Sequence, residues 1–116
     1  MVLAVIVATG AAALETATAV DGDTLRIGAE RVRVMGLDAP EMHARCLAES
    51  RLAWAAFLRM DDLVRDGVTV ERRGLDRYQR TLAVVRDSRG RDVAVVMIRE
   101  GLARPNDGGR RQGWCG

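Results

Sequence analysis

The chain has 116 residues, a length that supports one small domain with a single hydrophobic core and excludes two. Hydrophobic residues make up 48% and charged residues 29%, a balance typical of a folded protein that excludes an intrinsically disordered one. The net charge of +2 does not by itself indicate a nucleic-acid partner, and all 18 basic residues are arginine, so a single arginine is weak evidence of a binding site.

The chain begins with an apolar, alanine-rich run, MVLAVIVATGAAA. This run is shorter than the roughly 20 apolar residues that cross a bilayer as a helix, so we expect no stable membrane span. Its length and its alanine ending are typical of a signal peptide, although the usual basic start is missing. We therefore predict a candidate leader over residues 1–13, a single domain over residues 14–116, and a secreted or periplasmic location. The alternative is a leading strand or a mis-assigned start.

In the next segment, alternation of apolar and polar residues predicts three strands, over residues 16–20, 24–28 and 31–37. The first two meet at Asp21-Gly22, which is a strong hairpin signal. Val32 and Val34 should share one face of the third strand, and Arg33 should point the opposite way.

Between residues 47 and 65 the apolar period becomes helical. The residues of this stripe are expected in the core: Leu52, Ala56, Met60 and Leu63. Asp66-Gly67 ends the helix, and two further strands are predicted over residues 68–72 and 81–86. Residues 92–100 fit either a buried strand or a short helix, and Gly101 favours the helix. This order predicts an α+β fold, mainly a five-stranded β barrel with two helices packed outside it.

Two cysteines, Cys46 and Cys115, lie far apart in the sequence. In an exported domain such a pair favours a disulfide, and closing so long a loop would stabilise the fold by about 4 kcal/mol. The alternative is two thiols in a cytosolic protein. Together with the single histidine, His43, they cannot form a usual four-ligand zinc site, and His43 is expected to be an ordinary loop residue.

Two segments hold the residues that point to chemistry, VDGDTLRIGAERVRVMGLDAPE at residues 20–41 and DRYQR at residues 76–80. The first supplies three carboxylates, Asp23, Asp38 and Glu41, and the two together supply Arg33 and Arg80. Carboxylate oxygens suit calcium, and planar guanidinium groups match phosphate oxygens. The pattern indicates a metal-assisted phosphodiester hydrolase. Taken singly, the acids would be ordinary turn or loop residues, and Arg33 an exposed strand residue.

These motifs resemble the staphylococcal nuclease, or thermonuclease, family. Five blocks occur in the family's order: DGDT, the strand with Arg33, DAPE, DRYQR and EGLA, the last at residues 100–103. The likeness covers residues 16–103 and, more loosely, the end of the chain. It implies an oligonucleotide-binding (OB) barrel with the activity of a calcium-dependent nuclease, which cleaves DNA and RNA with little sequence preference and leaves 3′-phosphates.

The resemblance also implies roles for single residues. Asp23, Asp38 and the Ala39 carbonyl would bind Ca²⁺. Arg33 and Arg80 would grip the phosphate as catalytic residues. Glu41 would be the general base, although a role in positioning water would use the same geometry.

Arg77 and Tyr78 would contact a neighbouring phosphate or sugar, and Tyr78 could equally cap the barrel. Asn106 stands where many relatives carry an aromatic residue. The family's third, C-terminal helix is replaced by a tail in which Trp114 is expected to be an anchor. We expect a monomer. The alternative function is a catalytically inactive OB-fold module that binds single-stranded nucleic acid, although such modules usually lose the carboxylates that this chain keeps.

Overall fold

The computed structural model describes residues 13–106 and 113–115. The candidate leader therefore lies, except for Ala13, outside the described residues. The elements in chain order are β1 (Thr18–Ala19), β2 (Thr24–Ile27), β3 (Glu30–Val34), β4 (Leu37–Asp38), α1 (Leu47–Val64), β5 (Val68–Leu75), β6 (Thr81–Asp87), α2 (Val93–Arg99) and β7 (Arg104–Pro105). Neither helix of this described part is long and apolar enough to cross a membrane.

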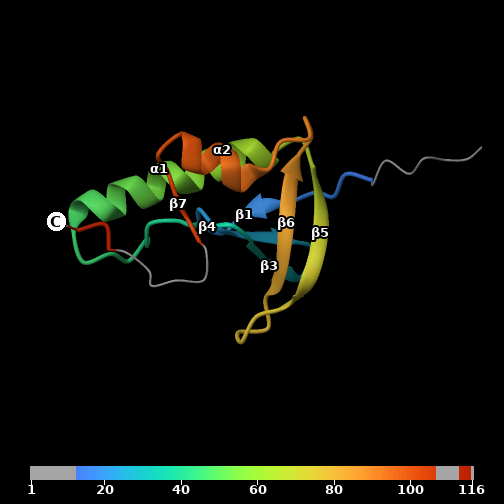
Figure 1. The fold of residues 1–116 in the computed structure, drawn as a ribbon, viewed down its shortest axis with the longest axis horizontal. Coiled ribbons are helices and arrows are strands. Elements are labelled where there is room, and N and C mark those ends of the chain that lie inside the picture. The colour runs from blue at the N-terminus through green and yellow to red at the C-terminus, as the bar shows by residue number, and fades with distance from the viewer. Residues whose placement is uncertain (1–12, 107–112, 116) are drawn as a thin grey trace, which may run out of the picture.

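Five strands form one mixed sheet in the order β1-β2-β3-β6-β5. Figure 1 shows its two longest strands, β5 and β6, side by side. All its neighbours are antiparallel except β3 and β6, which are parallel. The predicted α+β class with two helices is confirmed, but the predicted closed barrel is not what forms. β1 has only two residues, and the two edges of the sheet meet through a single bridge between Glu15 and Val68.

A second, two-stranded ladder was not predicted. The third strand was expected to run over residues 31–37, but Gly36 has φ +95°, and β3 ends before it. The chain leaves the sheet there, and β4 pairs with β7 through Leu37↔Pro105 and Asp38↔Arg104. Strands of two residues carry no readable alternation, so the sequence does not reveal them. The ladder moves Asp38 away from the plane of β3.

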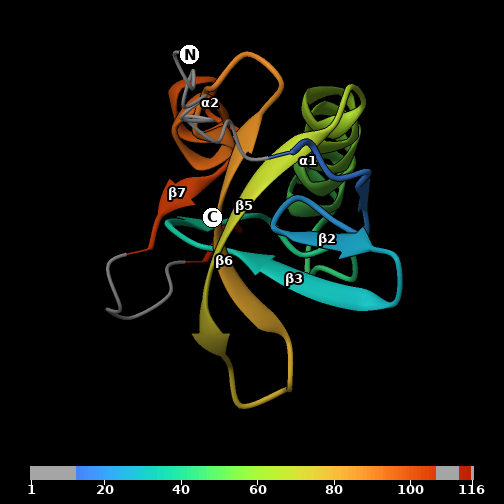
Figure 2. The ribbon, with the colours of Figure 1, turned by 90° about the vertical axis from the view of Figure 1, so that its right-hand side faces the viewer.

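The core lies between the sheet and the two helices, which stand on the same side of it (Figure 2). The predicted face of β3 is confirmed, because Val32 and Val34 are fully buried. The predicted stripe of α1 is largely confirmed, with Ala56, Met60 and Leu63 buried and Leu52 partly exposed. The residues over 93–99 form a helix, as Gly101 indicated, and Asp92 caps its start by accepting from two backbone N–H groups.

Gly22 lets the turn before β2 approach α1 closely. A Cβ atom at this position would lie 2.7 Å from the Ala39 Cβ and 2.9 Å from the Ala56 Cβ, distances that side chains do not tolerate. The absence of a side chain therefore allows the turn that carries Asp23 to pack beside the segment that follows Asp38.

The end of the chain returns to the start of α1. Cys46, the N-cap residue of α1, and Cys115 form a disulfide. Figure 1 shows the C-terminal end lying beside the first turn of this helix. The disulfide thus holds the tail against the loop that contains Glu41 and His43.

Candidate active site

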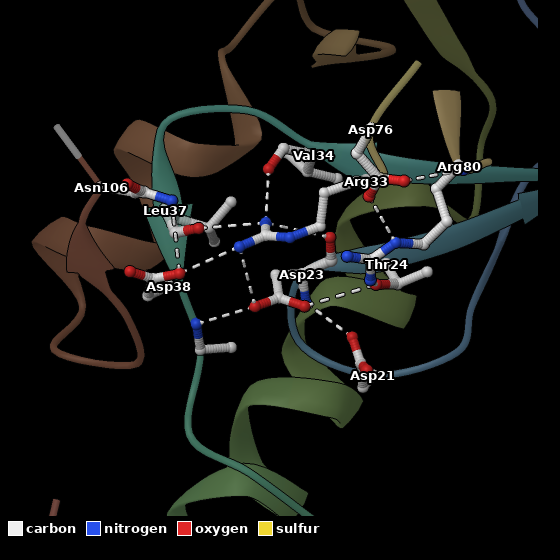
Figure 3. A network of polar contacts seen from close by, with 11 residues as sticks. Asp21, Asp23, Thr24, Arg33, Val34, Leu37, Asp38, Asp76, Arg80 and Asn106 are labelled. Atoms are coloured by element: carbon white, nitrogen blue, oxygen red, sulfur yellow. Dashed lines mark hydrogen bonds and ion pairs between the residues drawn. The ribbon is translucent and has the colours of Figure 1, made fainter. Parts of the chain in front are cut away.

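The Asp23 and Asp38 carboxylates converge on one nitrogen of the Arg33 guanidinium (Figure 3). The Arg33 Nη2 atom lies 3.5 Å from the Asp23 Oδ2 and 2.9 Å from the Asp38 Oδ1. The two carboxylate side chains are only 14% and 19% exposed. We call Asp23 and Asp38 the acid pair. The turn before β2 supplies one member and the short β4 strand the other.

Arg33 is held by the backbone as well as by the acid pair. Its Nη1 atom donates to the Val34 carbonyl at 2.7 Å and to the Leu37 carbonyl at 3.1 Å. Its side chain is 13% exposed, so it is not the exposed strand residue that the alternative reading required. Carbonyl oxygens at the turn after β3 therefore fix this guanidinium against the acid pair.

The Asp23 carboxylate carries the main electrostatic perturbation of the site. Burial raises its pKa to about 6, although the Arg33 charge lowers it, and the nearby Asp21 carboxylate raises it further. The Asp23 Oδ2 accepts a hydrogen bond from the Ala39 N–H at 3.1 Å. One guanidinium thus does not offset the burial of this carboxylate beside other acids, and a further positive charge there would be favourable.

The DRYQR segment forms a turn built on Asp76. The Asp76 carboxylate accepts hydrogen bonds from the Arg80 Nε at 2.7 Å and from the Arg80 and Tyr78 backbone N–H groups. The Arg80 Nη1 atom lies 3.5 Å from the Thr24 Oγ1, which in turn donates to the Asp23 Oδ1 at 3.3 Å. Figure 3 shows Arg80 linked to Asp23 through the Thr24 hydroxyl, beside the Arg33 guanidinium.

A cleft of about 380 Å³ adjoins this arrangement, and we call it the arginine cleft. Its charged and polar lining consists of Arg33, Asp76, Arg77, Tyr78, Arg80 and Asn106. The ring of Tyr78 is exposed and lies under two guanidiniums, those of Arg77 at 4.9 Å and Arg80 at 5.3 Å. The cleft therefore presents several cations next to the acid pair.

Asn106 belongs to the site, although the sequence suggested only that it lacks an aromatic ring. Its Nδ2 atom donates to the Asp38 Oδ1 at 3.4 Å, and its backbone N–H donates to the Gly36 carbonyl at 3.2 Å. The β4–β7 ladder, which was not predicted, brings Asn106 to this place.

The structure places Glu41 in a neighbouring hollow rather than in the lining of the arginine cleft. Glu41 is exposed, and its backbone N–H donates to the Glu49 Oε2 at 2.8 Å. Glu49 is buried, and sequence reasoning missed it. The sequence feature that could have identified Glu49 is its place three residues after Cys46, where a carboxylate commonly accepts hydrogen bonds from free backbone N–H groups at the start of a helix.

The donor set of the acid pair fits calcium in chemical type. Two carboxylates and the Ala39 carbonyl are hard oxygen donors, and calcium accepts such ligands together with water in irregular geometry. Within residues 13–106 and 113–115, no group of three or more acidic, histidine or cysteine side chains is placed to hold a metal ion. A bound ion would therefore depend on the carbonyl and on water, and it would share the acid pair with Arg33.

Buried carboxylates beside a cleft lined by arginines define a site suited to phosphate esters. Comparison with known proteins agrees with this class. The family model described as staphylococcal nuclease homologue matches residues 31–112, and the chain belongs to this family. The match includes Arg33, Asp38, Glu41 and the DRYQR segment, and it begins after Asp23.

The chain is also similar to the succinoglycan biosynthesis protein ExoI of Rhizobium meliloti (strain 1021). The two are 35% identical over 101 residues, which cover 78% of this chain and 51% of ExoI. The chain therefore spans about half the length of this curated relative.

Proposed function

We propose that the protein is a calcium-dependent nuclease that hydrolyses phosphodiester bonds of DNA and RNA with little sequence preference. The observation that carries the proposal is the pairing of both acids with Arg33, which itself lines the arginine cleft. Guanidinium groups that contact phosphates read the backbone rather than the bases, which favours low sequence preference. The disulfide supports an exported location, because disulfides persist in oxidising compartments.

In this proposal, Asp23, Asp38 and the Ala39 carbonyl hold the ion. When bound, calcium supplies positive charge that stabilises the phosphate as it gains negative charge. Arg80 acts in the same direction from the chain itself, since Asp76 fixes its Nε and orients the guanidinium at the cleft. Arg33 holds the acid pair at its spacing and contributes a second positive charge.

Glu41 is proposed to take the proton from the attacking water or to position that water. Its carboxylate is on an exposed loop residue three positions after Asp38, and its backbone is anchored by Glu49. This assignment rests on the family resemblance, in which Glu41 belongs to the same DAPE block as Asp38.

One observation favours the alternative, a module that binds single-stranded nucleic acid on an OB-type sheet without cleaving it. Arg33 already pairs with both members of the acid pair, so these carboxylates have a cationic partner in the absence of any ion. If Arg33 held them too tightly for calcium to enter, the arginine cleft would still bind phosphates.

The test is digestion of end-labelled single-stranded DNA, double-stranded DNA and RNA in calcium, in magnesium and in a chelator. We expect cleavage in calcium, and a loss of about 100-fold or more in rate for Glu41→Gln and Arg80→Ala. Arg99→Ala, at the exposed end of α2, is the matched control and should keep full activity.

Cleavage that survives chelation, or that survives both substitutions, would contradict the proposal. Binding of an intact oligonucleotide without cleavage in excess calcium would favour the alternative.

A further inference from the structure

A second hollow, of about 400 Å³, lies on the Glu41 side of the site, and we call it the Trp114 hollow. Its lining combines an aromatic ring with charged side chains: Glu41, His43, Arg45, Glu49 and Trp114. None of the roles proposed above uses this hollow except through Glu41.

Trp114 is fixed in place by its neighbours. The Arg104 guanidinium lies 3.8 Å from the centre of the Trp114 ring, and its Nη1 atom donates to the Gly113 carbonyl at 2.7 Å. The next residue, Cys115, is bonded to the start of α1. An aromatic side chain held in this way loses little conformational entropy when a second flat group stacks on it.

The charges of the two hollows differ, and the difference indicates what each one binds. The arginine cleft contains three arginines and one acid, which favours a phosphate. The Trp114 hollow contains two carboxylates, Glu41 and Glu49, which oppose a phosphate but can accept hydrogen bonds from the N–H groups of a base. Arg45 also lines it and offers a cation to the phosphate attached to that base.

From these observations we infer that the Trp114 hollow binds one nucleobase of the substrate, stacked on the ring of Trp114. Stacking tolerates every base, so the inference agrees with low sequence preference. The inference rests on the proposed function for its substrate class, but it concerns binding and does not require cleavage.

The test measures binding in a chelator, where no calcium-dependent cleavage can occur. A fluorescent single-stranded oligonucleotide is compared with a series in which successive positions are abasic, using the wild type and Trp114→Leu. We expect Trp114→Leu to bind the intact strand about 10-fold more weakly. One abasic position should cost the wild type the same factor and cost Trp114→Leu nothing further. Trp54→Leu, which alters an exposed tryptophan on α1, is the matched control and should bind normally.

A second measurement avoids dependence on the stability of Trp114→Leu. The chain has two tryptophans, so in the Trp54→Phe variant the fluorescence reports Trp114 alone. The intact strand should quench this fluorescence, and the strand with the critical abasic position should not.

Two results would overturn the inference by showing that Trp114 only anchors the tail. One is equal quenching by both strands. The other is that the losses of affinity caused by Trp114→Leu and by the abasic position multiply when the two changes are combined. If the wild type fails to cleave in calcium but gives the expected binding pattern, the proposed nuclease activity fails while the base site stands.

Discussion

Replacing Asp23 by asparagine should make the protein more stable at neutral pH relative to the wild type, although it removes a proposed calcium ligand. Burial raises the pKa of the Asp23 carboxyl from 3.8 to about 6. An acid with a raised pKa in the folded state is destabilising when it is ionised, because the unfolded chain releases the proton more easily. The asparagine variant has no proton to release.

The expected gain in the free energy of unfolding follows from the shift in the pKa of Asp23. Each unit corresponds to about 1.4 kcal/mol, so a rise from 3.8 to about 6 costs the folded protein about 3 kcal/mol once the carboxylate is fully ionised. Between these two pKa values the folded protein keeps a proton that the unfolded chain has lost, so the stability falls as pH rises. From about pH 4.5 to about pH 7.5 the wild type should lose about 2 kcal/mol relative to Asp23→Asn.

The assay is urea unfolding of both proteins at the two pH values in a chelator. The difference between the two pH values matters, because the asparagine also loses hydrogen bonds, such as that from the Ala39 N–H, at a cost that does not depend on pH. Asp66→Asn, at an exposed position after α1, controls for the removal of one surface charge. A stability gap that stays constant with pH, or that changes in favour of the wild type as pH rises, would show that Arg33 outweighs burial. Calcium should reduce the gap.

Three further outcomes are expected. Hydrogen bonds, chiefly from Arg72, lower the pKa of Glu30 to about 2. Glu30→Gln should therefore reduce the free energy of unfolding near neutral pH by about 1 kcal/mol, after allowance for solvent screening. Thermal melts should show this loss vanishing as the pH falls from about 4.5 to about 2. Cys46→Ser combined with Cys115→Ser opens a disulfide that spans 69 positions and should cost about 4 kcal/mol in urea unfolding, whereas an unchanged midpoint would show that the bridge does not constrain the unfolded chain. Arg33→Met leaves the acid pair without its counter-charge and should lower the free energy of unfolding in a chelator by about 3 kcal/mol. Calcium should restore part of this stability in thermal melts. If it restores none, no ion binds at the acid pair.

The sequence predicted the fold where the pattern of residues is long enough to read. The alternation in β3 and the helical stripe of α1 each extend over several residues, and the structure has both. The expected barrel failed because closure depends on the length of β1, and nothing local in the sequence shows that this strand has only two residues. The β4–β7 ladder was not predicted because its strands are also only two residues long.

For the candidate site, too, the sequence predicted some residues and missed others. The resemblance implied that Asp23, Asp38, Glu41, Arg33 and Arg80 form one site. The structure brings Asp23 and Asp38 within ion-pair distance of Arg33, whereas Glu41 lines the neighbouring hollow. The roles of Asn106 and Glu49 depend on contacts between distant segments, which the sequence pattern does not contain. The position of Glu41 is similar, because the disulfide and the returning tail build the hollow that it lines.

The charge count at the acid pair suggests how ion and substrate would depend on each other. Two carboxylates and the Arg33 guanidinium leave one net negative charge when Asp23 is ionised, and this charge repels a phosphodiester. A divalent cation reverses the sign, so the same place then attracts the phosphate. Binding of calcium and binding of nucleic acid should therefore strengthen each other by equal factors, since coupling between two ligands is reciprocal. The burial that makes Asp23 costly in the empty site is thus what makes the site sensitive to the ion.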